Sequence, residues 1–154
     1  MLFRSVKDVR ELIAQAKARP GSVTVGTAGN ATSTHLLLEN LGLITGAQFT
    51  HVPFKGDAPA VTELVAGRLS AGIHPLGAPL PHVRSGRLRA VASNLERRLA
   101  LLPEVPTLAE QGLKEASAST WFGLATNAGV STAIVNRLNT EAAAFLAQPE
   151  VRDR

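Results

Sequence analysis

Residues 23–38 read VTVGTAGNATSTHLLL and contain three patterns in succession. Val23–Val25 is a β-branched run typical of a short buried strand. Two glycines in residues 26–30 then let the backbone turn tightly. From about Thr32, hydroxyl side chains precede a cluster of leucines, which predicts a capped helix with a buried apolar side. This stretch therefore predicts a strand, a loop and a helix.

The same alternation extends along the chain in both directions. Upstream, Ser5 and Asp8 resemble a capping box for a helix whose apolar residues recur at helical spacing as far as Ala16, and Pro20-Gly21 ends it. Downstream, short apolar runs predict further strands, which are Phe49–Val52 (stopped by Pro53), Leu69–Ile73, Leu88–Ala92 and Trp121–Ala125.

Helical segments separate these expected strands. They are a helix capped by Asp57 with Pro59 in its first turn and ending at Gly67, a proline-interrupted helix or turn at Pro75–Val83, a short helix opened by the capping box Thr107–Glu110 and closed by Gly112, and a long amphipathic helix capped by Ser131. Strands that alternate with helices predict an α/β fold with a largely parallel sheet and helices on both faces.

The composition is that of a globular protein with a hydrophobic core. Of 154 residues, 45% are apolar and 18% are charged, which fits one domain of ordinary size. No stretch approaches the roughly 18 uninterrupted apolar residues of a membrane span, and the N-terminus lacks the pattern of a signal peptide. Because cysteine is absent, disulfides, thiol nucleophiles and cysteine-ligated metals are excluded.

The net charge of +4 is modest, and the basic residues are spread along the chain. Their densest stretch, between Arg84 and Arg98, has no interleaved aromatic residues. The chain has no tyrosine and a single tryptophan, Trp121. A nucleic-acid interface needs clustered charge, preferably with stacking aromatics. We therefore expect a solvated face and no nucleic-acid partner.

Three loops follow predicted strands, where open parallel sheets bind ligands. The first, residues 26–34, places hydroxyls and free amides at a helix N-terminus, whose partial positive charge favours an anion. The alternative is that Thr32 or Ser33 merely caps the helix, and composition favours neither reading. The spacing matches neither a dinucleotide fingerprint nor a phosphate-binding loop.

The other two loops each offer one polar side chain. Lys55, in residues 52–57, either adds positive charge near the cleft or is simply solvated, the latter being the more common state of a lysine. His74, followed by Pro75, comes directly after a strand and is able to exchange a hydrogen bond with a ligand. Alone, it would be a loop histidine without an assigned role.

No catalytic or metal-binding arrangement is apparent. Ser33 and His35 are two residues apart on a helix and point in different directions, and His35 is expected to be a hydrogen-bonded structural residue. The nucleophile-elbow and zinc-protease motifs are absent. The histidines have no metal-ligand spacing; they are His35, His51, His74 and His82. We expect no metal, no cofactor and no enzymatic activity.

Ten segments, spread over nearly the whole chain, match the sequence pattern of a known protein family in the same order. They are Val6–Asp8, Glu11–Gly21, Gly26–His35, His51–Gly56, Ala58–Ala60, Leu80–Val83, Ser85–Ala90, Leu102–Leu113, Trp121–Leu124 and Ile134–Asn139. In this order they resemble the receptors of tripartite tricarboxylate transporters, also called the Bug family of extracytoplasmic solute receptors.

The resemblance implies the two-lobed clamshell fold of periplasmic binding proteins and a location in the periplasm. Since family members are longer, it implies that an N-terminal stretch forming the opposite wall of the cleft, and a C-terminal tail, lie outside this chain. Residues 5–118 would be the second ligand-binding lobe. Residues 119–154 would be a partial return into the first lobe, a strand followed by a long helix.

The resemblance also implies a small carboxylate ligand and membrane transporter subunits as partners. The residues matching the ligand-binding loops are Thr27, Ala28, Asn30, Thr32, Ser33, His74 and Pro75. Many relatives have an acidic residue where this chain has His74, and an acidic side chain there holds a ligand ammonium group. We therefore expect amino-acid ligands to be disfavoured. A second departure, Ser70 in place of Asp, is expected to change only packing or capping.

A competing hypothesis is a structural or interaction lobe that binds no ligand. A lobe without its partner leaves apolar surface uncovered, and such surface promotes association. A homodimer through this surface would favour that hypothesis.

Overall fold

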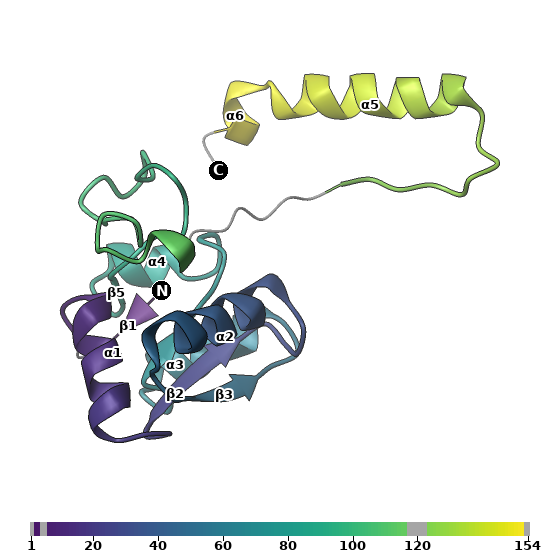
Figure 1. Ribbon diagram of the computed structural model, residues 1–154. Helices are drawn as coiled ribbons and strands as arrows, with labels where there is room; N and C mark the ends of the chain where they lie inside the picture. Colours follow the sequence, from purple (N-terminus) through teal and green to yellow (C-terminus); the bar gives the residue numbers. More distant parts are fainter. Residues whose placement is uncertain (1, 4–5, 117–122, 153–154) are drawn as a thin grey trace. The chain divides into compact units, whose positions relative to one another are not determined.

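The computed structural model describes residues 2–3, 6–116 and 123–152. The chain divides into two compact units, Met1–Thr120 and Trp121–Arg154. Figure 1 shows the elements of both units.

A five-stranded sheet lies at the centre of the first unit (Figure 1). Across the sheet, the order is β3 (Phe49–Pro53), β2 (Val23–Thr27), β4 (Ala71–Gly72), β1 (Leu2–Phe3) and β5 (Arg89–Ala90). Strand β2 runs parallel to β3 and β4, whereas β1 runs antiparallel to both β4 and β5. The predicted α/β fold with a largely parallel sheet is confirmed. The antiparallel β1 was not predicted.

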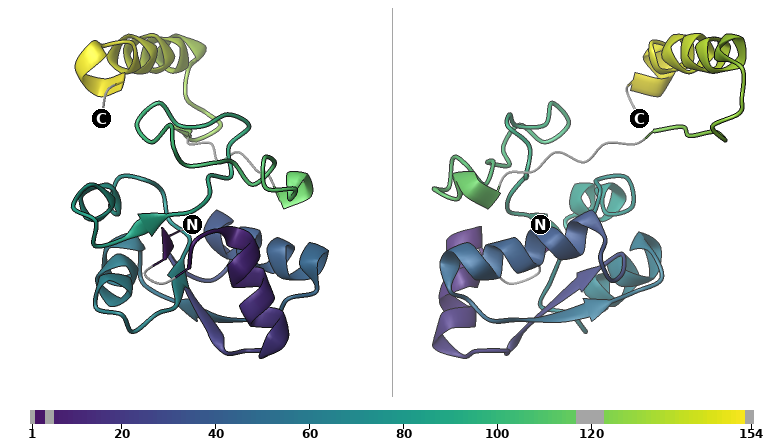
Figure 2. Two further views of the ribbon diagram at one scale, coloured as in Figure 1. Left: turned by 90° about the vertical axis from the view of Figure 1, so that its left-hand side faces the viewer. Right: turned by 45° about the vertical axis from the view of Figure 1, so that its right-hand side comes forward.

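Helices cover both faces of this sheet (Figure 2). On one face, α1 (Val9–Ala18) and α2 (Ser33–Thr45) pack with the β2 side chains Val23 and Val25 in one apolar cluster. On the other face, α3 (Asp57–Val65) contributes Val61 and Leu64 to a second cluster, which also contacts the short helix α4 (Leu80–Arg84). The sheet therefore separates two cores.

Two of the predicted strands are shorter than expected. β4 and β5 each contain two residues, although Leu69, Ile73 and Leu88 beside them are buried. These side chains pack into the two apolar clusters, although none of the three residues belongs to the short strands. An apolar run in the sequence therefore predicts which residues are buried, and the buried stretch is longer than the strand itself.

Two helix starts differ from the prediction. Helix α1 is capped by Asp8, whose Oδ1 accepts the Glu11 N–H at 2.8 Å, while the Lys7 N–H donates to Glu11 Oε2 at 2.8 Å. The expected cap, Ser5, lies outside the described residues. In α3, Asp57 is the first helical residue and Gly56 occupies the cap position, because the Asp57 carboxylate is hydrogen-bonded to His74 instead.

The predicted capping box at Thr107 forms, but it opens a series of turns. Thr107 N–H donates to Glu110 Oε2 at 2.7 Å and Glu110 N–H donates to Thr107 Oγ1 at 3.1 Å. Arg98 also binds the Glu110 carboxylate and lowers the pKa of that carboxyl. A 3-10 helix, η1 (Lys114–Ala116), follows these turns. The expected α-helix ending at Gly112 is therefore wrong.

The second unit contains α5 (Thr132–Leu146) and α6 (Pro149–Arg152). Ser131 stands at the N-cap of α5 as predicted, although its side chain makes no capping hydrogen bond. Of the strand predicted at Trp121–Ala125, residues 121–122 lie outside the described part, and residues 123–125 are not a strand. Among the described residues, no helix has the length and apolar character that crossing a membrane requires.

Candidate functional site

Three loops meet at the carboxyl-terminal edge of the parallel strands. The loop after β2 is tied to the one after β3 by the Phe54 N–H, which donates to Thr27 O at 3.1 Å, and by the Gly56 N–H, which donates to Ala28 O at 3.0 Å. On the other side, the Ile73 N–H donates to Gly26 O at 3.0 Å. Backbone hydrogen bonds thus fix the spacing of the three predicted loops.

Hydroxyl groups organise the inside of the first loop. The fully buried Thr27 has its Oγ1 2.7 Å from His51 Nε2, and it accepts the Gly29 N–H at 3.3 Å. Thr32 Oγ1 donates to Gly29 O at 2.8 Å and accepts the His35 N–H at 3.3 Å. Thr32 therefore caps α2, which was one of the two interpretations of this loop from the sequence. It also closes the loop.

Several backbone N–H groups of this loop have no acceptor among the described residues. They belong to Asn30, Thr32, Ser33 and Thr34. Asn30 and Ser33 are exposed, and the last three amides open a helix of 13 residues. Unpaired amides at a helix N-terminus carry partial positive charge, so the two sequence readings, capping and anion attraction, are compatible here.

A left-handed residue gives the loop its turn. Ala31 has φ 58°, and it is the only described residue other than glycine with a positive φ. This conformation costs an L-residue roughly 1–2 kcal/mol. The Ala31 N–H donates to His35 Nδ1 at 3.0 Å, so a side chain one turn into α2 offsets part of that cost.

Two histidine rings stack beneath the loop. The ring centroids of His35 and His51 are 3.9 Å apart and the ring planes differ by 11°. His35 Nε2 lies 3.4 Å from Glu39 Oε1. Burial, and secondarily the neighbouring His35, lower the pKa of His51. The expectation that His35 is a hydrogen-bonded residue agrees with this geometry.

The third loop begins with a buried ion pair or hydrogen bond. His74 Nδ1 lies 2.8 Å from Asp57 Oδ1, with the imidazole fully buried and the carboxylate about one quarter exposed. Burial lowers the pKa of His74 more than Asp57 raises it. The ring therefore joins the second and third loops and does not reach the surface, whereas Pro75 is exposed.

The imidazole of His74 occupies space that Gly72 leaves open. A Cβ on Gly72 would lie 2.6 Å from His74 Nε2 and 3.1 Å from Leu64 Cδ2. We expect Gly72→Ala to lower the free energy of unfolding by about 1–3 kcal/mol, because it overpacks a buried site. Gly77→Ala is the matched control, since a Cβ on Gly77 meets nothing. Urea unfolding measures both variants.

Two further outcomes bear on this clash. Gly72→Ala should cost less stability in a His74→Ala background than in the parent chain, because the clashing ring is then absent. Equal losses for Gly72→Ala and Gly77→Ala would contradict the packing of His74 over Gly72.

The low pKa values of His51 and His74 predict a pH dependence of stability. Both pKa values lie below the ordinary 6.5. As the pH falls through 6.5, these two histidines are therefore protonated in the unfolded chain while they remain neutral in the folded chain. Stability is then full above pH 6.5 and declines below it. His74→Asn keeps a donor for Asp57 but does not titrate, so its decline between about pH 7.5 and about pH 5.5 should be shallower. Thermal unfolding at a series of pH values tests this.

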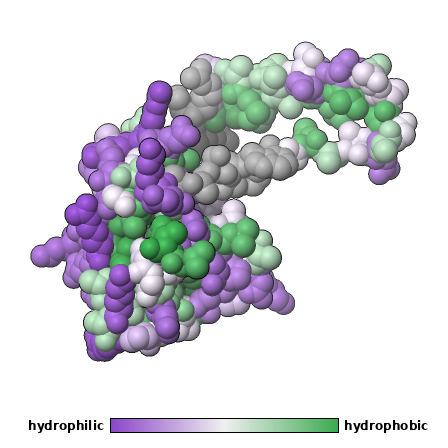
Figure 3. All heavy atoms as spheres, in the orientation of Figure 1, coloured by the Kyte–Doolittle hydropathy of each residue, from purple (hydrophilic) through white to green (hydrophobic). Residues whose placement is uncertain are grey.

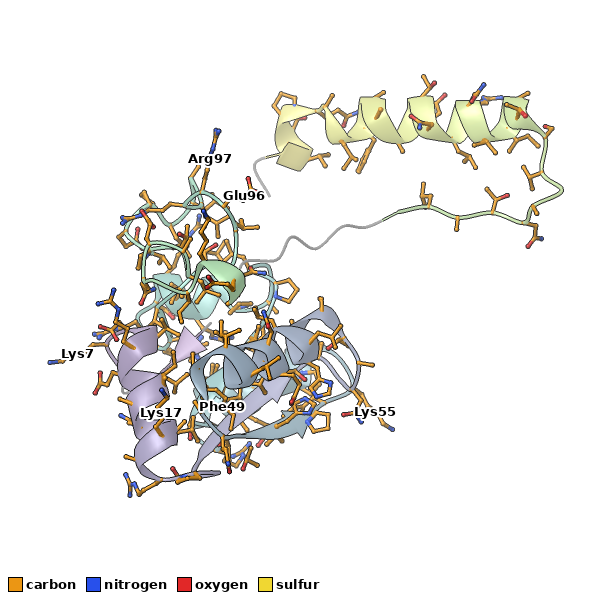
Figure 4. All side chains as sticks on the ribbon, viewed as in Figure 1. Lys7, Lys17, Phe49, Lys55, Glu96 and Arg97 are labelled. Carbon is orange, nitrogen blue, oxygen red and sulfur yellow. The ribbon has the colours of Figure 1, made fainter. Side chains whose placement is uncertain are left out.

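The residues expected to bind ligand occupy different positions in this edge. Asn30 and Ser33 are exposed, Ala28 and Thr32 are half-buried, and Thr27 is buried and organises the loop. Lys55 is exposed and its side chain extends away from the sheet (Figure 4). No group of three or more potential metal-ligating side chains occurs within residues 2–3, 6–116 and 123–152.

Sequence reasoning missed three contributors to this edge. Asp57 was assigned to capping, and His51 was given no partner. Thr34, whose Oγ1 lies 2.9 Å from Thr32 Oγ1 and accepts the Ala28 N–H at 3.4 Å, was not singled out. The spacing of His35 and Glu39, one helical turn apart, was an available signal for the polar cluster.

The chain resembles known proteins over most of its length. The family model for the tripartite tricarboxylate transporter family receptor matches residues 4–154. Protein BugT of Bordetella pertussis is 43% identical over 128 residues, covering 83% of this chain and 39% of BugT.

Two solved structures from Rhodopseudomonas palustris have the same fold. One, a protein with adipate, has a TM-score of 0.89 and 34% identity, and the match covers 97% of this chain and 51% of that one. The other, MatC with bound malate, has a TM-score of 0.85 and 27% identity, covering 98% of this chain and 52% of MatC. The chain thus spans about half the length of these structures.

Proposed function

Because the chain belongs to the tripartite tricarboxylate transporter receptor family, we propose that it is the part of a solute receptor that holds one carboxylate of a small ligand. The main support for this proposal is the set of unpaired backbone amides at Asn30, Thr32, Ser33 and Thr34. Solved relatives contain adipate or malate, and both are small dicarboxylates.

The loop suits recognition without bond breaking. Its hydroxyls are already engaged in holding the turn, so the amides are preorganised donors for an incoming anion. The contacts would come from Ala28, Asn30, Thr32 and Ser33, with Thr27 fixing the loop from below. No bound group is transformed in this scheme, so the proposed role is binding and not catalysis.

The third loop would contribute through Pro75 and its backbone. His74 would support it from inside by its hydrogen bond to Asp57. Asp57 puts a carboxylate beside this loop. Because that carboxylate is already hydrogen-bonded to His74, we still propose that plain carboxylates bind better than amino acids.

We propose the following larger arrangement from family membership. Residues 5–118 form the second lobe of a clamshell receptor in the periplasm, and residues 119–154 return to the first lobe. The opposite wall of the cleft would come from the first lobe, and the receptor would deliver its ligand to membrane transporter subunits. Since closure of two lobes buries a ligand, this chain alone should bind weakly.

NMR titration of the 15N-labelled chain tests the ligand proposal. Malate or adipate should shift the amide signals of Asn30, Thr32, Ser33 and Thr34 in a saturable way. Aspartate, which replaces the malate hydroxyl with an ammonium group, should shift them less at equal concentration. Saturable shifts confined to other residues would contradict the assignment of the loop. Stronger binding of aspartate would contradict the proposed ligand class.

A second candidate function is association through α5, which one observation favours. Large apolar residues along α5 are exposed, and all of them except Ile134 line, with Gly123, Leu124 and Thr126, an open groove of about 470 Å³. They are Ile134, Val135, Leu138, Phe145 and Leu146. Figure 3 shows green side chains along this helix. Light scattering that detects a discrete homodimer, with no carboxylate-induced NMR shifts, would support an interaction module instead.

A further inference from the structure

The left-handed Ala31 requires a partner that keeps it in place. With φ 58° it holds a conformation that alanine seldom adopts. Residues on either side of it, Asn30 and Thr32, carry unpaired amides, so the φ of Ala31 decides where those donors point. The one acceptor for the Ala31 N–H among the described residues is His35 Nδ1, at 3.0 Å.

This hydrogen bond requires one protonation form of His35. Since Nδ1 accepts a hydrogen bond from the Ala31 N–H, the single ring proton of neutral His35 must be on Nε2. Nε2 lies 3.4 Å from Glu39 Oε1, and a carboxylate at that distance favours a proton on Nε2 over one on Nδ1. A proton on Nδ1 would place two donors against each other at Ala31.

A neighbouring strand supports the ring from the other side. His51 on β3 stacks on His35 with centroids 3.9 Å apart, and its Nε2 is 2.7 Å from Thr27 Oγ1. The groups facing the pair are therefore Glu39 from α2, Thr27 from β2 and the loop itself. Burial and His35 lower the pKa of His51, which favours its neutral form as the stacking partner.

We propose that His35 is a positioning residue of this loop, which as the Nε2–H tautomer accepts the Ala31 amide and so holds the neighbouring amides toward the ligand. It touches no ligand itself. The positioning does not depend on the proposed function, whereas its effect on affinity rests on carboxylate binding by the same loop.

The tautomer is measured without any ligand. In the 154-residue chain labelled with 15N-histidine, His35 should show an unprotonated Nδ1 and a protonated Nε2 at neutral pH. A His35 signal with the proton on Nδ1 would overturn the proposal, whether or not the chain binds carboxylates.

Three variants separate the acceptor from the ring. His35→Phe keeps the stacking on His51 but removes the acceptor, and it should speed hydrogen exchange of the Ala31 amide about tenfold. His35→Asn offers Oδ1 near the place of Nδ1 and should restore much of the protection. Leu43→Ala, at an exposed position of the same helix, is the control and should leave exchange of the Ala31 amide unchanged. Exchange in His35→Phe within twofold of the parent chain would overturn the proposal, as would equal exchange in His35→Asn and His35→Phe.

A double variant links the position to affinity. Ala31→Gly removes the cost of the left-handed conformation, so His35→Phe should weaken malate binding less in the Ala31→Gly background than in the parent chain. Equal weakening in both backgrounds would overturn the link between Ala31 and affinity. If the parent chain bound no malate, the proposed function would fail, while the tautomer and exchange results would still decide the positioning role.

Discussion

Replacing Ser33 with aspartate is expected to weaken malate binding about 100-fold while it stabilises helix α2. Ser33 is the first residue of α2, it is exposed, and its own amide is unpaired. A carboxylate there would lie within a few ångströms of the proposed ligand carboxylate, and at the effective dielectric of a protein surface such repulsion reaches about 3 kcal/mol. The same charge at a helix N-terminus adds about 0.3–1 kcal/mol of stability.

Because Ser33→Asp should weaken malate binding and at the same time raise the free energy of unfolding, general destabilisation cannot explain the expected result. NMR titration measures the affinity, since it also detects weak binding, and urea unfolding measures the stability. Ser33→Asn has nearly the same shape as Ser33→Asp without the charge and should stay within a few-fold of the parent chain. Ser131→Asp adds the same charge at the start of α5 and should leave malate binding unchanged. If Ser33→Asp bound malate as tightly as Ser33→Asn did, the ligand carboxylate would not lie at this loop.

The largest expected effect on stability comes from Leu41 on the inner side of α2. Its side chain is fully buried in the cluster formed with α1 and β2. Truncation to alanine removes apolar contacts and leaves a cavity, so Leu41→Ala should lower the free energy of unfolding by about 2–5 kcal/mol. Urea unfolding followed by circular dichroism provides the measurement.

Leu43 on the same helix is the matched control. It is 83% exposed, so Leu43→Ala should change the free energy of unfolding by no more than about 0.5 kcal/mol. Both variants make the same substitution in the same helix, and helix propensity therefore cancels between them. Similar losses in the two would mean that α2 packs through a different face.

The parallel part of the fold was predictable because its signals are local. Val23–Val25, the glycines after it and the leucines of α2 specify a strand, a turn and an amphipathic helix within one short stretch. Strand β1 was not predictable in this way. It has two residues, and its pairing partners Gly72 and Ala90 are distant in the sequence, so no periodicity marks it.

In the candidate site, too, local features were predictable and contacts between distant residues were not. The loop with unpaired amides was predictable, because a glycine-rich turn before a capped helix leaves amides free for reasons of backbone geometry. The side-chain contacts beneath it were not, since the pairs Thr27 with His51 and Asp57 with His74 join residues from different strands and loops. Asp57 shows how a local rule fails: it has the type and position of a helix cap, but a buried imidazole competes for its carboxylate.

The place of β1 in the sheet has a consequence for how the chain folds. Strands β4 and β5 are joined through β1 and have no ladder with each other among the described strands. Strands β2, β3 and β4 can pair through short connections. Strands β1 and β5 can join the sheet only after Leu2 and Phe3 contact residues 71–72 and 89–90, which are distant in the sequence. Closing such long loops is entropically slow, so this half of the sheet should be the last to gain protection during refolding.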